Sequence, residues 1–211
     1  MAADGIRAVV FDVGEVLYRW RPADIYAGHI GDEAARDRFV ADVVSMDWHD
    51  QHDIGRPFAE TSAELSARFP EHADLIALWG PNFNASLSPM PGMAALVDEL
   101  DAAGVPLYAI TNFSGEFWAA FVATQGHVFD RFRGIVVSGD EKLMKPDPAI
   151  YRLALDRFGL DPAEAIFVDD RAANVAGAQA AGMAAHRFTG ADDFRARLVR
   201  DGLLPAARAA A

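Results

Sequence analysis

The stretch AVVFDVGEVL, residues 8–17, decides the fold of this chain. Its apolar first half stops abruptly at the carboxylate of Asp12, and Gly14 follows two residues later. Short apolar runs rich in β-branched residues are typical of buried strands, so we expect the central strand of a parallel sheet here. Ligands of open α/β sheets bind beyond the carboxyl ends of the strands, which is where this strand places Asp12.

Length and composition indicate a soluble globular protein. The 211 residues are 52% hydrophobic and 24% charged, enough for one large domain or a domain with an insertion. The chain has no apolar run near the roughly 20 residues of a membrane span, and its N-terminus has no signal-peptide pattern. It contains no cysteine, which excludes disulfides, zinc–thiolate sites and thiol catalysis. We therefore expect a cytoplasmic protein without membrane contact.

The charge balance narrows the choice of partner. A formal net charge of −12 disfavours nucleic acid, whose phosphates require clustered basic residues. An anionic substrate would therefore need a local positive feature. Only two of the 19 basic residues are lysines, and both lie in EKLMKP, residues 141–146. This usage suggests that the compact charge of lysine has a particular purpose there.

Strand-like and helix-like segments divide the chain into two parts. After a loop that leaves the first strand at residues 18–22, helical patterns occur at 33–44, 58–69 and 73–83, with a turn at 53–57. Further strands at 105–110, 134–137, 165–168 and 183–188 alternate with helices. We expect an α/β protein, a Rossmann-like parallel sheet with helices on both faces. Residues 1–17 and 89–211 would form this core domain, and residues 18–88 an inserted helical cap domain.

Polar residues follow four of the expected strands at the point where each strand ends. They are Asp12, Thr111 with Asn112, Lys145, and Asp169 with Asp170. Because parallel strands end at one edge of a sheet, these side chains should share one crevice. Clustered carboxylates require a cation, and oxygen ligands favour Mg²⁺. A carboxylate nucleophile with Mg²⁺ and a fixed lysine is suited to phosphoryl transfer through an aspartyl-phosphate.

Four motifs carry a resemblance to a known family. FDVGEVL (residues 11–17), ITN (110–112), KPDP (145–148) and VDDRAAN (168–174) resemble the motifs of the haloacid dehalogenase (HAD) superfamily, in the family's order. The core and inserted cap account for nearly the whole chain. A helical cap after the first motif, the C1 type, is similar to that of the subgroup containing small sugar-phosphate phosphatases and the phosphatase domain of epoxide hydrolases.

The resemblance implies a role for each motif residue. Asp12 would be the nucleophile that attacks phosphorus, Thr111 and the Asn112 amide would hold the phosphoryl group, and Lys145 would offset its charge.

The resemblance also implies a magnesium site. Asp12, the Gly14 carbonyl and Asp170 would bind Mg²⁺ directly, and Asp169 would act through a water. Asn174 would orient this acidic loop.

Gly14 departs from the family's pattern. Most phosphatases of the superfamily have an aspartate there, which protonates the leaving alkoxide. General acid–base help is worth about 10² to 10⁴-fold, so its loss should slow hydrolysis of esters with poor leaving groups. Glu15 is adjacent, but neighbouring side chains of an extended loop point to opposite sides. Substrate-assisted chemistry or a cap residue are further possibilities.

The cap contains one polar-aromatic stretch, WHDQHD at residues 48–53. One interpretation places His52 or Arg56 over the substrate, with the histidine as a proton donor. The other interpretation is a solvated segment between helix and turn.

We expect a Mg²⁺-dependent phosphatase of small phosphomonoesters, acting on a phosphorylated metabolite as a monomer or homodimer. A 2-haloacid dehalogenase is the first alternative, since a halide leaving group needs no general acid, although dehalogenases of the family lack the acidic pair at 169–170. A non-catalytic module that binds a phosphorylated ligand is the second.

Overall fold

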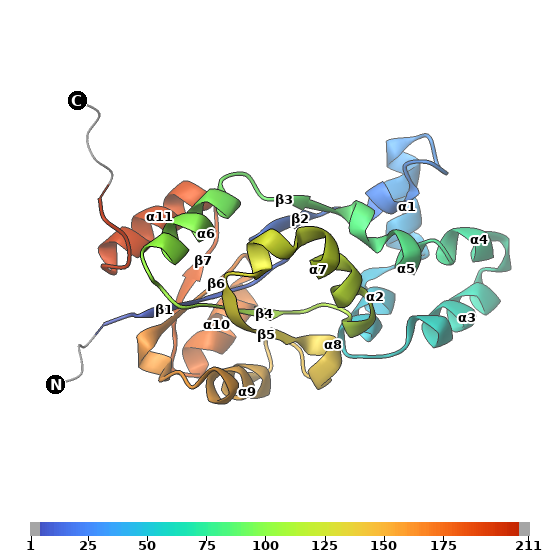
Figure 1. The fold of residues 1–211 in the computed structure, drawn as a ribbon. Coiled ribbons are helices and arrows are strands. Elements are labelled where there is room, and N and C mark those ends of the chain that lie inside the picture. Colours follow the sequence, from blue (N-terminus) through green and yellow to red (C-terminus); the bar gives the residue numbers. More distant parts are fainter. Residues whose placement is uncertain (1–4, 207–211) are drawn as a thin grey trace, which may run out of the picture.

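A five-stranded parallel sheet forms the core of the computed structural model, which describes residues 5–206 (Figure 1). The strand order is β5-β4-β1-β6-β7, so β1 is central as predicted. Val9 of β1 lies opposite Leu107 of β4 and Ile166 of β6. The strands are β1 (Ala8–Phe11), β4 (Leu107–Thr111), β5 (Phe132–Val137), β6 (Ala165–Asp169) and β7 (Ala184–Arg187).

Helices cover both faces of the sheet, which confirms the expected fold class. Val9 and Phe11 of β1 pack into one apolar cluster with the first group of helices, and Ala8 and Val10 pack into a second cluster with the other group. The first group is α6 (Met93–Ala102), α7 (Gly115–Phe129) and α11 (Ala191–Arg200), and the second is α9 (Pro148–Phe158) and α10 (Ala172–Ala180). The short α8 (Ser138–Glu141) follows β5. Within residues 5–206, no helix combines the length and apolar character that a bilayer crossing requires.

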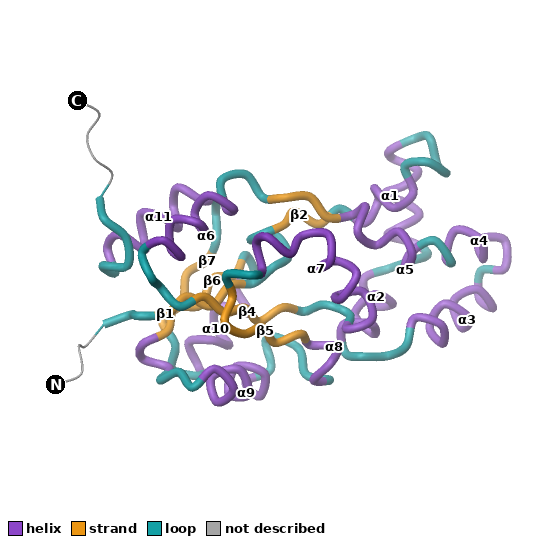
Figure 2. The backbone as a smooth tube through the Cα atoms, in the orientation of Figure 1, coloured by secondary structure: helices purple, strands orange, loops and turns teal. Residues whose placement is uncertain are grey.

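A helical cap is inserted between β1 and α6 and extends to one side of the sheet (Figure 2). Its helices are α1 (Glu33–Asp42), α2 (Met46–Asp53), α3 (Phe58–Arg68), α4 (Ala73–Ile76) and α5 (Trp79–Asn82). Two antiparallel strands, β2 (Tyr18–Trp20) and β3 (Leu87–Pro89), connect it to the core. The predicted loop at 18–22 is therefore wrong in its first three residues. We propose that the cap comprises residues 18–88, bounded by this strand pair.

Two other cap segments differ from the prediction. The helix expected at 73–83 is divided into α4 and α5, because Pro81 has no backbone N–H to bond the carbonyl four residues earlier. Residues 48–53 are not a solvated segment but most of helix α2, in which Trp48, His49 and His52 are buried.

Candidate active site

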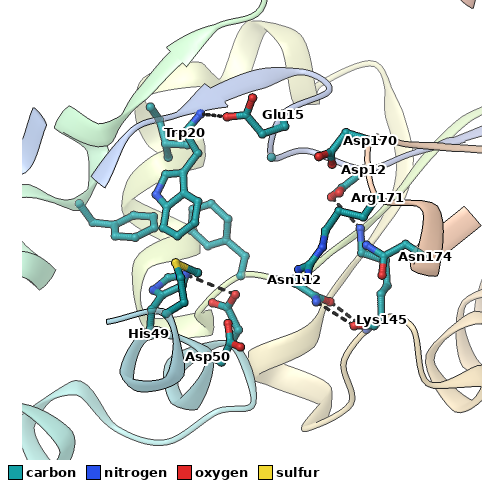
Figure 3. Close-up of a pocket in the computed structure, with 16 residues that line it drawn as sticks. Asp12, Glu15, Trp20, His49, Asp50, Asn112, Lys145, Asp170, Arg171 and Asn174 are labelled. Carbon is teal, nitrogen blue, oxygen red and sulfur yellow. Dashed lines mark hydrogen bonds and ion pairs between the residues drawn. The ribbon is translucent and has the colours of Figure 1, made fainter. Parts of the chain in front are cut away.

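The carboxyl ends of three neighbouring strands bring the predicted polar residues together (Figure 3). Asp12 directly follows β1, Thr111 ends β4, and Asp169 ends β6 with Asp170 next in the chain. Lys145 enters from the loop between α8 and α9. Because β4 and β6 flank β1 in parallel register, their last residues meet at one edge of the sheet.

Lys145 lies at the centre of this group. Its ammonium Nζ lies 2.7 Å from Asp12 Oδ1 and 2.8 Å from Asp169 Oδ2, and the residue is only 2% exposed. The Asn112 side chain forms two hydrogen bonds with the backbone of Lys145. Its Nδ2 donates to the Lys145 carbonyl at 3.0 Å, and its Oδ1 accepts from the Lys145 N–H at 2.9 Å. Asn112 thereby fixes the direction from which the lysine approaches the two carboxylates.

The buried charges change one another's protonation. Burial raises the pKa of Asp12 well above its ordinary value, opposed by the Lys145 ammonium and reinforced by the charge of Asp169. Burial alone would also raise the pKa of Asp169, but Lys145 and hydrogen bonds outweigh it and hold this pKa below the usual value. Burial lowers the pKa of Lys145, but the two carboxylates outweigh it, so the net pKa is raised and the lysine stays charged. An ionised Asp12 therefore depends on nearby positive charge.

The acidic loop after β6 is held by its own residues. The Asn174 side-chain amide donates to both Asp169 oxygens, at 3.1 and 3.0 Å, and the Arg171 backbone N–H donates to Asp169 Oδ1 at 2.8 Å. Asp170 instead lines the cavity, and burial, followed by the charge of Asp169, raises its pKa. Asn174 therefore orients Asp169 and leaves Asp170 free to face the cavity.

These carboxylates suit a hard divalent cation. Asp12, Asp169 and Asp170 each offer an oxygen within 4.8 Å of the others. Gly14 lines the same cavity beside them. An all-oxygen donor set with only one lysine against three carboxylates fits Mg²⁺. Both Asp169 oxygens already accept hydrogen bonds, whereas, in the part of the chain that the structure describes, the contacts of the Asp12 carboxylate are made by Oδ1 alone. Asp12 and Asp170 are therefore the better placed direct ligands.

Thr111 is brought to the edge of the sheet but is fully buried. Its Oγ1 has no hydrogen-bond partner among the described residues. A buried hydroxyl without a partner is costly, and Thr111 is not among the residues that line the cavity. Its role in holding a phosphoryl group remains a proposal.

The turn after Asp12 has an unusual conformation. Glu15 has a left-handed backbone, with φ of 55°, and its N–H donates to the Tyr18 carbonyl at 2.7 Å. Its side-chain Oε1 accepts the backbone N–H of Trp20 at 2.6 Å. A Cβ built on Gly14 would meet no heavy atom within 4 Å, so the position has room for a side chain.

The cap closes the cavity of about 400 Å³ on the side opposite Asp12 (Figure 3). Its sixteen lining residues include His49, Asp50 and Asp53 from α2, but neither His52 nor Arg56. The interpretation that places His52 or Arg56 over the substrate is therefore corrected.

His52 and Arg56 are both held by other cap residues and so do not reach the cavity. The Nε2 atom of the fully buried His52 lies 2.7 Å from Thr61 Oγ1, within the cap. Arg56 forms an ion pair with Glu64 at 2.7 Å.

Comparison with known proteins identifies the family. The family model for haloacid dehalogenase-like hydrolases matches residues 6–182, most of the chain. The chain belongs to this family.

Two curated relatives of this HAD-like hydrolase are phosphatases. Sesquiterpene phosphatase astK of Aspergillus oryzae is 29% identical over 189 residues, covering 87% of this chain and 90% of the relative. A phosphoglycolate phosphatase of Yersinia pseudotuberculosis is 30% identical over 192 residues, covering 84% and 78%. A solved HAD family enzyme of Bacteroides thetaiotaomicron, in complex with magnesium and inorganic phosphate, matches with a TM-score of 0.68 at 22% identity, covering 88% and 96%. The last match supports the fold.

Sequence reasoning missed the cap residues of this HAD-like hydrolase that line the cavity. His49 and Asp53 are four residues apart on α2 and share a face of the helix, with Nε2 of the histidine 3.4 Å from Oδ2 of the aspartate. The i, i+4 spacing in WHDQHD was the available signal. Trp20 and Arg171, which also line the cavity, carried no such pattern.

Proposed function

We propose that this HAD-like hydrolase is a Mg²⁺-dependent phosphatase of small phosphomonoesters that acts through an aspartyl-phosphate on Asp12. The observation that carries the proposal is the bridge of Lys145 between Asp12 and Asp169 at the floor of a cavity that Asp170 also lines. The phosphatases among the relatives support the reaction class.

In the proposed reaction, an Asp12 oxygen forms a bond to phosphorus while the bond from phosphorus to the alcohol oxygen breaks on the opposite side. Water then attacks phosphorus, releases inorganic phosphate and regenerates the carboxylate. Lys145 contacts Asp12 and would offset negative charge on the transferring group. When bound by Asp12, Asp170 and the Gly14 carbonyl, Mg²⁺ would supply further positive charge for the phosphoryl oxygens.

The remaining residues position these groups. Asn174 orients Asp169, which in turn fixes the lysine, and Asn112 holds the lysine backbone. No side chain at Gly14 can protonate the departing alkoxide. We therefore expect esters with good leaving groups to be hydrolysed faster than alkyl esters.

The test is phosphate release from an activated aryl phosphate and a panel of phosphomonoesters, with Mg²⁺ and with a chelator. We expect Mg²⁺-dependent turnover that falls by at least about 10³-fold in Asp12→Asn, because an amide is not a competent nucleophile. Phosphate release from that variant at the wild-type rate would contradict the role of Asp12.

Assays of halide release from 2-haloacids and of ester binding, run beside this panel, separate the alternatives. Release of halide from 2-haloacids without phosphate release would favour a dehalogenase, and ester binding without turnover would favour a binding module. A small phosphorylated metabolite as substrate, a cytoplasmic location and a monomeric or homodimeric state stay predictions.

A further inference from the structure

The cavity has two chemically different halves. The core supplies a polar floor, where the phosphoryl group would lie against Asp12, Lys145 and Asp170. The opposite wall, where the leaving alcohol would lie, is largely apolar. Its apolar members are Trp20, Met46, Phe83, Leu87 and Phe113.

The aromatic part of this wall is closely packed. The His49 ring stacks on Phe83 with centroids 5.8 Å apart and lies 4.6 Å from Trp20. Phe83 also packs edge-on against Phe113 at 5.2 Å. A preformed apolar surface of this kind binds an apolar group without having to reorganise.

Met46 extends the apolar wall toward solvent. It is 44% exposed, and only one other large hydrophobic residue of the described chain, Ile54, is comparably exposed. Methionine is flexible and polarisable and adapts its shape to apolar ligands. Met46 lines the cavity, whereas Ile54 does not, so the exposed methionine belongs to the binding surface.

The charges on this wall oppose a second anionic group. Asp50 and Asp53 are both lining residues, and the His49 ring nitrogen faces Asp53 at 3.4 Å. Arg171, a lining cation besides the fully engaged Lys145, starts beside Asp170 on the core side and extends into the cavity (Figure 3). Its charge reaches Asp50 of the cap, where it partly offsets the effect of burial on the pKa of that carboxyl. A carboxylate on the leaving alcohol would therefore meet two carboxylates on the cap side, Asp50 and Asp53, against the single guanidinium of Arg171.

We infer that the substrate is the phosphate monoester of an apolar alcohol that carries no second anionic group. This inference rests on the proposed function and adds the substrate class. It separates hydrocarbon or aromatic alcohols, which the wall accepts, from short acidic alcohols such as glycolate, which it repels.

The experiment compares ethyl, butyl and hexyl phosphate with phosphoglycolate, with an activated aryl phosphate as a reference. The alkyl alcohols have similar basicity, so the chemistry is constant and only apolar contact changes. A buried methylene is worth about 0.8 kcal/mol, which corresponds to about fourfold in kcat/KM. We expect kcat/KM to rise about three- to fourfold per methylene from ethyl to butyl, with phosphoglycolate at or below ethyl phosphate.

Two variants at equally exposed residues test whether the gain per methylene comes from contact with the cavity wall. Met46→Gln should reduce the gain per methylene, and Ile54→Gln, which changes an equally exposed residue outside the cavity, should leave it unchanged. Asp50→Asn should raise the ratio of kcat/KM for phosphoglycolate to kcat/KM for hexyl phosphate several-fold.

The outcomes distinguish this inference from the proposed function. Equal kcat/KM along the alkyl series, or a preference for phosphoglycolate, would overturn the inference while Mg²⁺-dependent hydrolysis still supports the phosphatase. An equal loss in both glutamine variants would also overturn it. No release from any ester, the aryl phosphate included, would overturn the proposed function and this inference with it.

Discussion

Replacing Gly14 by aspartate should restore a general acid to the site. A Cβ at this position meets no heavy atom within 4 Å, and the residue is not among the glycines with a left-handed backbone. The Cβ of the new side chain therefore meets no steric conflict, and the backbone conformation is one that residues other than glycine adopt. Reduced freedom of the unfolded chain would contribute about 0.4 to 1 kcal/mol to stability, against repulsion from the nearby carboxylates.

The expected gain depends on the leaving group. Protonation by a positioned acid is worth about 10² to 10⁴-fold, so kcat for an alkyl phosphate should rise by at least about 10²-fold in Gly14→Asp. An activated aryl phosphate leaves without protonation, so its kcat should change by less than about threefold. The ratio of the two rates is therefore the quantity to measure, at saturating Mg²⁺.

Gly14→Asn is the matched control, because asparagine has nearly the same volume but no acidic proton. We expect it to resemble the wild type in the alkyl-to-aryl ratio. An aspartate variant that folds, hydrolyses the aryl ester and yet shows the same ratio as the asparagine variant would refute the reasoning. The wild-type protein would then already possess a proton donor, and Glu15, which lines the cavity, would be the first residue to test.

Three further predictions concern the buried charges. Lys145→Met leaves two buried carboxylates without their cation. Chemical denaturation should show a free energy of unfolding lower by about 3 kcal/mol. A loss under about 1 kcal/mol would contradict a stabilising role for the two ion pairs. Mg²⁺ at a hundred times its Kd should stabilise the wild type by about 2.7 kcal/mol, and Asp170→Asn should show much less stabilisation in the same thermal scans. Burial, then the neighbouring charges, lower the pKa of His52 from 6.5 to about 3. The neutral His52 ring therefore contributes its full stabilisation of the folded state above pH 6.5, and this stabilisation is lost as the pH falls toward 3. Between pH 7.5 and 5 this loss should be about 2 kcal/mol, absent in His52→Asn and unchanged in the exposed-residue control His29→Gln.

The polar floor of the site could be predicted because topology alone brings it together. Asp12, Thr111 and Asp169 stand at the ends of three strands, and parallel pairing places those ends side by side whatever the details of packing. The alternation of apolar strands and amphipathic helices was sufficient to infer that pairing. Lys145 could be placed because it is one of only two lysines in the chain and follows the third strand end.

The cap wall could not be predicted in the same way, because the orientation of a helix about its axis depends on packing. In α2, the two apolar residues Met46 and Trp48 lie on different faces and polar residues fill the rest, so no apolar stripe shows which side is buried. Trp48 and His52 face the cap interior, where they pack edge-on at 4.5 Å, and His49 and Asp53 face the cavity. The pairing of β2 with β3 joins two three-residue strands far apart in the chain, too short to give a periodic signal.

The turn at Gly14 and Glu15 connects the floor to the wall. A left-handed Glu15 is strained by about 1 kcal/mol or more, and two hydrogen bonds offset this strain, one to the Tyr18 carbonyl and one from the Trp20 N–H to the Glu15 carboxylate. The second bond places the end of β2, and with it the indole of Trp20, at the cavity. The carboxylate nearest the nucleophile in sequence therefore holds the apolar wall in place. A proton donor from this residue would have to break that bond first, which is why we assign the missing acid to Gly14 and the binding of the alcohol to the wall that Glu15 positions.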